Sequence, residues 1–176
     1  DKSFAQINMA GVENLIVDVR FNGGGSPESA VYLLRYISDK PFLYYSDSGY
    51  QAKETQEEVA PFANAFAGQC YFIIDGEGNS TTGHFMSMVK TLDLGPIVGE
   101  ELGSNQFCTG GGTPARLRNT EFNFQVGNNN NTTTATELPD EVGILPDYYV
   151  TQSIDDYMDR KDVVKEKALE LIEISN

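Results

Sequence analysis

Hydrophobic and polar positions along the chain predict buried strands that alternate with amphipathic helices. Two short and almost continuous apolar runs stand out, residues 14–19 (NLIVDV) and residues 70–75 (CYFIID). Runs of this length that are rich in Val, Ile, Leu and aromatic residues are typical of strands buried on both faces. A glycine-containing loop follows each run, and a segment with helical spacing follows each loop. The chain is therefore predicted to contain two strand–loop–helix units of an α/β fold with a mostly parallel sheet.

The two predicted helices begin directly after the glycine loops. The first starts at Pro27, a residue that suits the first turn of a helix, and runs to about Ser38. The second covers residues 81–93. Apolar side chains recur at helical spacing in both, namely Val31, Leu33, Leu34 and Ile37, then Phe85, Met88, Val89 and Leu92. Because both loops follow the carboxyl ends of strands, we expect a functional site at that edge of the sheet.

The remaining segments carry weaker signals. Alternation over residues 115–126 predicts a β-hairpin towards the C-terminal side, and residues 161–174 have the pattern of an amphipathic helix. Two polar or glycine-rich segments, residues 102–114 and 127–137, are predicted to be a flexible loop and a mobile surface loop. Short strands are expected at 42–45, within 95–101 and within 143–150, a hairpin or loop at 46–53, and a short helix with irregular structure over 54–66.

Composition narrows the classes of partner. The chain has 176 residues, with 12 basic and 26 acidic side chains, so its formal net charge is −14. Nucleic acids and anionic membrane surfaces bind proteins through positively charged surfaces. Because this chain is strongly acidic, nucleic acid is not an expected partner. No apolar run approaches the roughly 20 residues that a membrane-spanning helix needs. We find no internal repeat and no clear domain boundary, and we interpret residues 1–176 as one domain core cut from a longer chain.

The cysteine and histidine content gives no metal or cofactor signal. The chain has two cysteines and one histidine, too few soft ligands for a zinc site. Cys70 opens an apolar strand and is expected to be buried, whereas Cys108 lies in a glycine-rich loop and could be exposed. We therefore expect neither a metal nor a cofactor.

The candidate catalytic residues lie in the two glycine-containing loops. In the first, Gly23 and Gly24 can adopt positive φ and let successive N–H groups face one point, a geometry suited to an oxyanion. A phosphate-binding turn or a plain tight turn would use the same residues. In the second, Ser80 occupies the helix N-cap, where its hydroxyl lies beside free N–H groups and the positive end of the helix.

Four short motifs in order resemble one family. Residues 17–25 (VDVRFNGGG) resemble a DLRxNGGG stretch, and residues 143–150 (GILPDYYV) resemble a GIxPDxxV segment. Residues 73–90 and 161–172 are similar to the strand, loop and nucleophile helix and to the C-terminal helix of that family. The family is that of the C-terminal processing (tail-specific) serine peptidases, whose catalytic domain has a ClpP/crotonase-like fold. The resemblance implies this fold, with flanking helices and a C-terminal hairpin region.

The resemblance also implies roles for individual residues. Ser80 would be the nucleophile, and the oxyanion hole would consist of Gly23, Gly24 and the N–H of Thr81. Alignment on Glu100 in the IVGEE segment favours Ser80, whereas alignment on the Gly-His pair within the helix makes Thr81 the nucleophile. Donors of this kind stabilise a tetrahedral oxyanion by roughly 10²–10³-fold each.

The general base is the point at which the chain departs from the family. Many members use a lysine shortly after the IGE segment, but no lysine lies between Lys90 and Lys161. The base could be a histidine from a preceding segment, as in the tricorn-like branch of the family. It could also be His84, one helical turn beyond Ser80. Alternatively, the protein could be a catalytically inactive homologue that binds peptides or acts as a scaffold.

The expected function is hydrolysis of polypeptides by a serine-type endopeptidase. Relatives of this kind usually work outside the cytoplasm, so an extracytoplasmic location is expected. A third reading, an acyl-CoA enzyme of the crotonase type, would need an adenine-binding surface and an acid in place of Ser80. The sequence does not indicate substrate specificity or oligomeric state.

Overall fold

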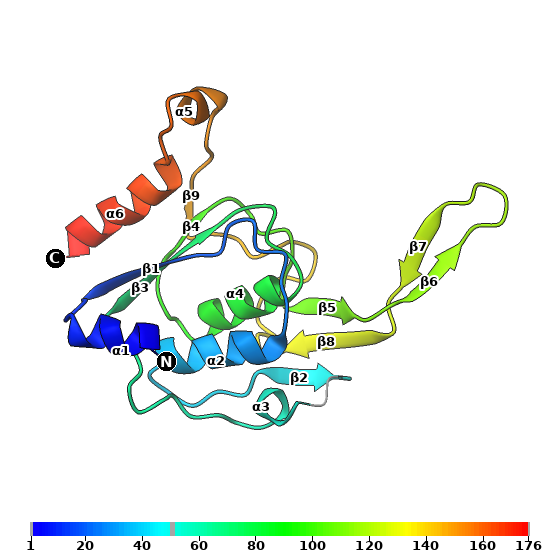
Figure 1. Cartoon of the computed structure of the whole chain (residues 1–176), viewed down its shortest axis with the longest axis horizontal. Helices are drawn as coiled ribbons and strands as arrows, with labels where there is room; N and C mark the ends of the chain where they lie inside the picture. The colour runs from blue at the N-terminus through cyan, green and yellow to red at the C-terminus, as the bar shows by residue number, and fades with distance from the viewer. Residues whose placement is uncertain (1, 50–51, 176) are drawn as a thin grey trace.

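A parallel four-stranded sheet forms the centre of the computed structural model, which describes residues 2–49 and 52–175 (Figure 1). The strand order is β1-β3-β4-β9, and all neighbouring pairs are parallel. Both predicted strands are present, with Val17 opposite Phe72 in the register. Only β3 is buried as predicted, because β1 is an edge strand whose residues are half-buried or, at Asp18, exposed. The bounds of the four strands are Asn14–Asp18 (β1), Gln69–Ile74 (β3), Ile97–Gly99 (β4) and Tyr148–Tyr149 (β9).

Helices cover both faces of this sheet. Helices α2 (Pro27–Ile37) and α4 (Thr81–Thr91) pack on one face, and α6 (Val163–Ser175) packs on the other. The side chains of β3 alternate between the two layers: Phe72 joins the core with α2 and α4, whereas Ile73 joins the core with α6. This double burial explains why β3 is a continuous apolar run rather than an alternating one.

A second, antiparallel sheet has the strand order β2-β8-β5 and includes two segments that were predicted to be loops. Its strands are β2 (Tyr45–Ser48), β8 (Asn129–Thr133) and β5 (Phe107–Gly110). The loop predictions for residues 102–114 and 127–137 are therefore wrong where they cover β5 and β8. The buried hydroxyl of Thr133 in β8 is paired with helix α4, where it lies 2.9 Å from the buried hydroxyl of Ser87. Hydrogen bonds of this kind satisfy the side chains that a polar strand buries.

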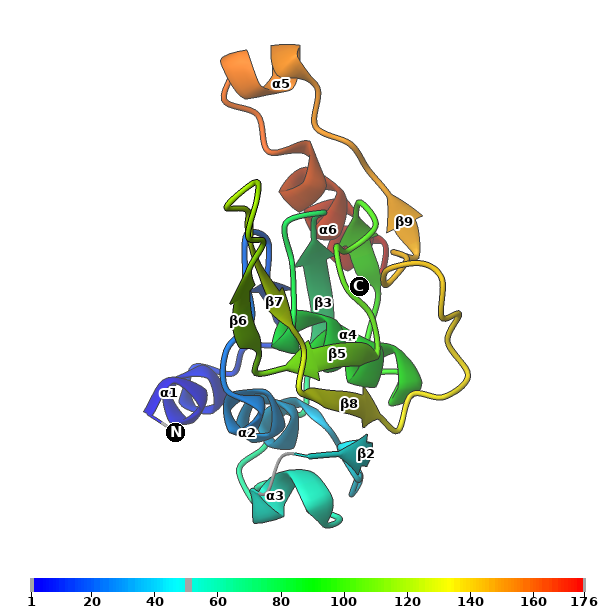
Figure 2. The same cartoon turned by 90° about the vertical axis from the view of Figure 1, so that its right-hand side faces the viewer.

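The predicted hairpin is also present and extends from the body of the molecule as an arm. It consists of β6 (Thr113–Arg116) and β7 (Asn123–Val126), and both views show it continuing from β5 and β8 (Figures 1 and 2). The short helices are α1 (Lys2–Met9), α3 (Lys53–Gln56) and α5 (Ile154–Met158).

Two further sequence expectations can be compared with the structure. The strand expected at 42–45 begins later, at Tyr45, and Phe42 forms only an isolated bridge with Val59. Residues 50 and 51, in the middle of the hairpin or loop expected at 46–53, lie outside the described residues. Among the described residues, no helix has the length and apolar character needed to cross a membrane.

Candidate active site

Ser80 lies where the loop after β3 enters helix α4, at the N-cap of that helix. Its backbone angles are φ 56° and ψ −126°, an unfavourable conformation for a residue with a side chain. Such residues cost on the order of 1–3 kcal/mol and persist where the surroundings fix them, often at functional sites. The Ser80 side chain forms no capping hydrogen bond, and its Oγ lies 3.5 Å from the Sγ of Cys108 in β5. The half-exposed hydroxyl is therefore not consumed by the helix cap.

The glycine loop packs directly against Ser80. Gly24 has φ +96°, and a Cβ atom placed on it would lie 2.8 Å from the Ser80 Cβ and 2.9 Å from the Thr81 nitrogen. The carbonyl of Asn22 accepts hydrogen bonds from the Asn79 N–H at 3.0 Å and from the Thr82 hydroxyl at 2.9 Å. The two loops singled out in the sequence are thus joined at one place, with a glycine at the closest contact.

The hydrogen-bond donors around Ser80 differ in their availability. The Thr81 N–H lies beside Gly24 and has no hydrogen-bond partner in the described part of the chain. The Gly24 N–H, in contrast, donates to the Asn22 Oδ1 at 2.9 Å. Gly23 is exposed, with open space around it. The Thr81 hydroxyl donates to the Gly25 carbonyl at 2.7 Å, so its geometry favours Ser80 as the nucleophile.

His84, the second candidate base, is 1 % exposed and engaged elsewhere. Its Nδ1 lies 3.2 Å from the Tyr45 hydroxyl, and its ring packs edge-on against Tyr45 and Tyr44. Burial lowers the pKa of His84 to about 4, an effect that the backbone of Asn131 opposes in part. Among the described residues, no imidazole, amine or carboxylate forms a hydrogen bond with the Ser80 hydroxyl. Because its pKa is about 4, the imidazole of His84 is neutral at pH 7, and its Nδ1 is paired with Tyr45.

A cavity of about 250 Å³, lined by both apolar and polar residues, opens beside the glycine loop. It lies between that loop and the facing surfaces of α2 and α4, and no sequence pattern predicts it. A cavity of this kind can accept a modest apolar side chain. Its apolar and glycine lining includes Val19, Gly24, Ala30, Leu33 and Phe85.

Cys108 is a further residue at the site that sequence reasoning did not find. It lies 28 residues after Ser80, on a strand that had been predicted to be a loop. The expectation that Cys70 is buried is confirmed, and burial raises the pKa of its thiol to about 12. Cys108 is half-buried.

Residues 1–150 match the sequence model of peptidase family S41. The chain belongs to this family. The match spans both loops and the sheet that carries them, and S41 proteins are serine peptidases, so the resemblance is confirmed for the three motifs that lie within residues 1–150. Helices α5 and α6 lie beyond the matched residues. No curated protein sequence matches the chain.

Solved structures support the S41 assignment at the level of fold. A candidate peptidase from Parabacteroides merdae superposes with a TM-score of 0.69 at 18% identity, covering 97% of this chain and 55% of that protein. The photosystem II D1 C-terminal processing protease gives 0.57 at 19% identity over 85% of this chain and 37% of that one. The tricorn protease gives 0.58 at 24% identity over 93% and 15%. The chain thus spans about half or less of each of these proteins.

Proposed function

We propose that the protein carrying this chain is a serine-type endopeptidase in which Ser80 forms an acyl-enzyme with polypeptide substrates. One observation carries the proposal: Ser80 is held at a strained N-cap and packs against Gly24, and its hydroxyl is not used for capping. A residue that only capped the helix would be expected to bond with the N–H groups of the first turn. Membership of a serine peptidase family supports the same conclusion.

The proposed chemistry is acyl transfer. The Ser80 oxygen attacks the carbonyl carbon of a peptide bond while its proton passes to a general base, and the carbonyl oxygen becomes an oxyanion. The N–H groups of Thr81 and Gly23 then stabilise that oxygen, whereas Gly24 mainly provides close approach because Asn22 occupies its N–H. Collapse of the intermediate breaks the C–N bond, and the amine leaves with the proton. Water attacks the resulting ester and regenerates Ser80.

The general base in this proposal is a histidine supplied by a segment outside residues 1–176, as in the tricorn-like branch. This follows from the surroundings of Ser80, whose hydroxyl contacts Cys108 and no basic group among the described residues. His84 is the weaker candidate because its Nδ1 is paired with Tyr45 and its pKa is low. A base also has to approach the nucleophile within about 3 Å.

The substrate proposed is an extended polypeptide with an apolar side chain next to the cleaved bond. The cavity beside Gly24 has the size and lining for such a side chain. We further propose an extracytoplasmic location, which rests on the resemblance alone. Detection of the native protein in the periplasmic, envelope or culture fraction rather than the cytoplasm tests this.

A second candidate is a catalytically inactive homologue that binds peptides. The observation in its favour is the same lack of a base against Ser80 within the described residues. Peptide affinity without turnover in the full-length protein would support it, whereas acyl-enzyme formation at Ser80 would exclude it.

A serine-reactive peptidyl phosphonate tests the proposed function in the full-length protein. We expect covalent labelling that Ser80→Ala abolishes and that Ser153→Ala leaves intact. Ser153 is a matched control because it is also a helix N-cap, at the start of α5, and it does not line the cavity proposed for the substrate. Thr81→Val, which keeps the backbone N–H and removes the hydroxyl, should still be labelled. Equal labelling of the wild type and Ser80→Ala would refute Ser80 as the nucleophile.

A further inference from the structure

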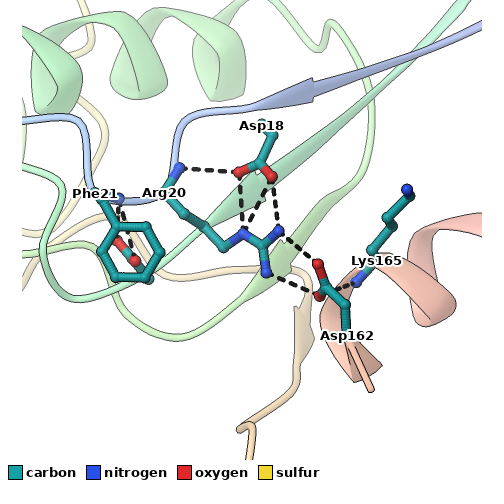
Figure 3. A network of polar contacts seen from close by, with 6 residues as sticks. Asp18, Arg20, Phe21, Asp162 and Lys165 are labelled. Atoms are coloured by element: carbon teal, nitrogen blue, oxygen red, sulfur yellow. Dashed lines mark hydrogen bonds and ion pairs between the residues drawn. The ribbon is translucent and has the colours of Figure 1, made fainter. Parts of the chain in front are cut away.

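A cluster of charged side chains ties the C-terminal segment to the strand that leads into the glycine loop (Figure 3). Arg20 is at its centre. Its Nε and Nη2 donate to the Asp18 carboxylate at 3.0 and 2.7 Å, and its Nη1 and Nη2 donate to Asp162 at 2.9 and 2.8 Å. The Arg20 side chain is only 17% exposed. A guanidinium bound in a fork on both sides has little freedom to move.

Asp162 comes from a part of the chain that the family match does not reach. It precedes helix α6, and its carboxylate also accepts a hydrogen bond from the Lys165 N–H at 3.0 Å, as an N-cap residue does. The hydrogen bonds from Arg20 are the main cause that lowers the pKa of Asp162, and the pKa of Arg20 is raised in return. Because α6 is packed on the sheet through Val164, this carboxylate is held on a rigid element.

The backbone that follows Arg20 forms the contacts that place the glycine loop. Phe21 has φ 58°, a genuine strain for a bulky residue, and its N–H donates to the Asp75 carboxylate at 3.1 Å. The next carbonyl, that of Asn22, accepts from Asn79 and Thr82 at the start of the Ser80 helix. A strained segment of this kind keeps its shape only when neighbours on both sides fix it. Arg20 fixes one side, and Asn22 fixes the other.

We propose that Asp162 is a positioning residue that acts through Arg20 to hold the glycine loop against Ser80. The proposal rests on the proposed function, since it concerns the reactivity of Ser80. The ion pair joins residues 142 positions apart, so it couples the docking of α6 to the geometry of the loop. A shift of about 1 Å in such a loop can lower a reaction rate by on the order of 10²-fold.

The decisive variant is Asp162→Asn, because asparagine is a good N-cap but lacks the charge and the second acceptor oxygen that bind Arg20. We expect the maximal rate of phosphonate labelling to fall about tenfold, with the half-saturating probe concentration nearly unchanged. Hydrogen exchange of the backbone amides in residues 20–25 should become faster in the same protein. Glu170→Gln is the matched control, since it removes the Lys167–Glu170 ion pair on the same helix without touching Arg20. It should change neither quantity.

Two further variants keep the outcome interpretable. Asp162→Glu retains a carboxylate and should recover part of the labelling rate. Arg20→Lys retains the charge but loses the two-pronged guanidinium contact, so its labelling and exchange should resemble those of Asp162→Asn. If Asp162→Asn does not fold, Arg20→Lys is the test variant. Wild-type labelling and unchanged exchange in Asp162→Asn would overturn the proposal. If Ser80→Ala is labelled like the wild type, the proposed function fails, while amide exchange in residues 20–25 still decides the role of Asp162.

Discussion

At the scale of single residues, the contact between Gly24 and Ser80 decides whether the candidate site can form. Gly24 combines φ +96° with backbone and Cβ atoms that would lie within 3 Å of any added side chain. Gly23, its neighbour, has neither restriction. The two adjacent glycines therefore differ in what the structure demands of them, because only at Gly24 would an added Cβ atom meet Ser80.

This pair gives a direct test of the loop. Gly24→Ala should destabilise the protein by about 2 kcal/mol or more, since it adds both backbone strain and a clash, and it should abolish labelling of Ser80. Gly23→Ala should change the free energy of unfolding by less than about 0.5 kcal/mol. Denaturant titration measures both. Equal effects of the two substitutions would contradict the contact described for Gly24.

His84 predicts a specific pH dependence of stability. Its pKa is about 4 in the folded protein against 6.5 ordinarily, because burial disfavours the imidazolium. The unfolded chain therefore binds a proton first as the pH falls, so the stabilisation is complete above pH 6.5 and is lost between pH 6.5 and about 4. The loss should be about 3 kcal/mol. His84→Gln removes the titrating group, and its free energy of unfolding should lack this slope; an identical slope in both proteins would assign it to other groups.

At the scale of elements, polar strands and the hairpin show where local pattern and tertiary structure differ. Strand β8 is a run of Asn and Thr, yet Asn131 and Thr133 are buried between β2 and β5. The hairpin shows the opposite, because it carries apolar residues that are exposed. Its register pairs Ala115 with Phe124 and Thr113 with Val126, and Val126 is 55% exposed. Burial in these elements follows from position in the fold rather than from hydrophobicity.

At the scale of the whole molecule, the central sheet depends on a layer that the family match does not include. Helix α6 covers one face through Val164, Ala168 and Leu171, which pack on Ile73 and Val98. The candidate site lies on the other side, with α2 and α4. Stability and site geometry are therefore linked across the sheet as well as through the ion pair of Arg20.

A truncation tests this dependence. Residues 1–150 contain Ser80, Thr81 and the glycine loop, but without α6 they would expose the apolar face formed by Ile73 and Val98. We expect this fragment to lose cooperative thermal unfolding and to bind a hydrophobic dye, because a sheet left bare on one face lacks the burial that stabilises it. The matched control is the chain of residues 1–176. Cooperative unfolding of both would show that α6 is dispensable.

The prediction of the fold from sequence succeeded where burial leaves a strong local signal. The strands at 14–18 and 69–74 and the helices that begin at Pro27 and Thr81 were found because their apolar runs and glycine loops are local features. Strands β5 and β8 were missed, since their hydrogen bonds lie with distant partners such as the Ser87–Thr133 pair. Propensity describes a segment, whereas these strands are defined by what they pair with.

The sequence by itself determined the family, the two strand–loop–helix units, and the choice of Ser80 beside a glycine loop, because motif order and apolar periodicity are written along the chain. Only the tertiary structure decided which glycine touches Ser80, that Cys108 lies 3.5 Å from its hydroxyl, and that Asp162 binds Arg20. These contacts join residues from 28 to 142 positions apart. A local pattern encodes how a segment folds, but the partner that it meets depends on how all the layers pack together.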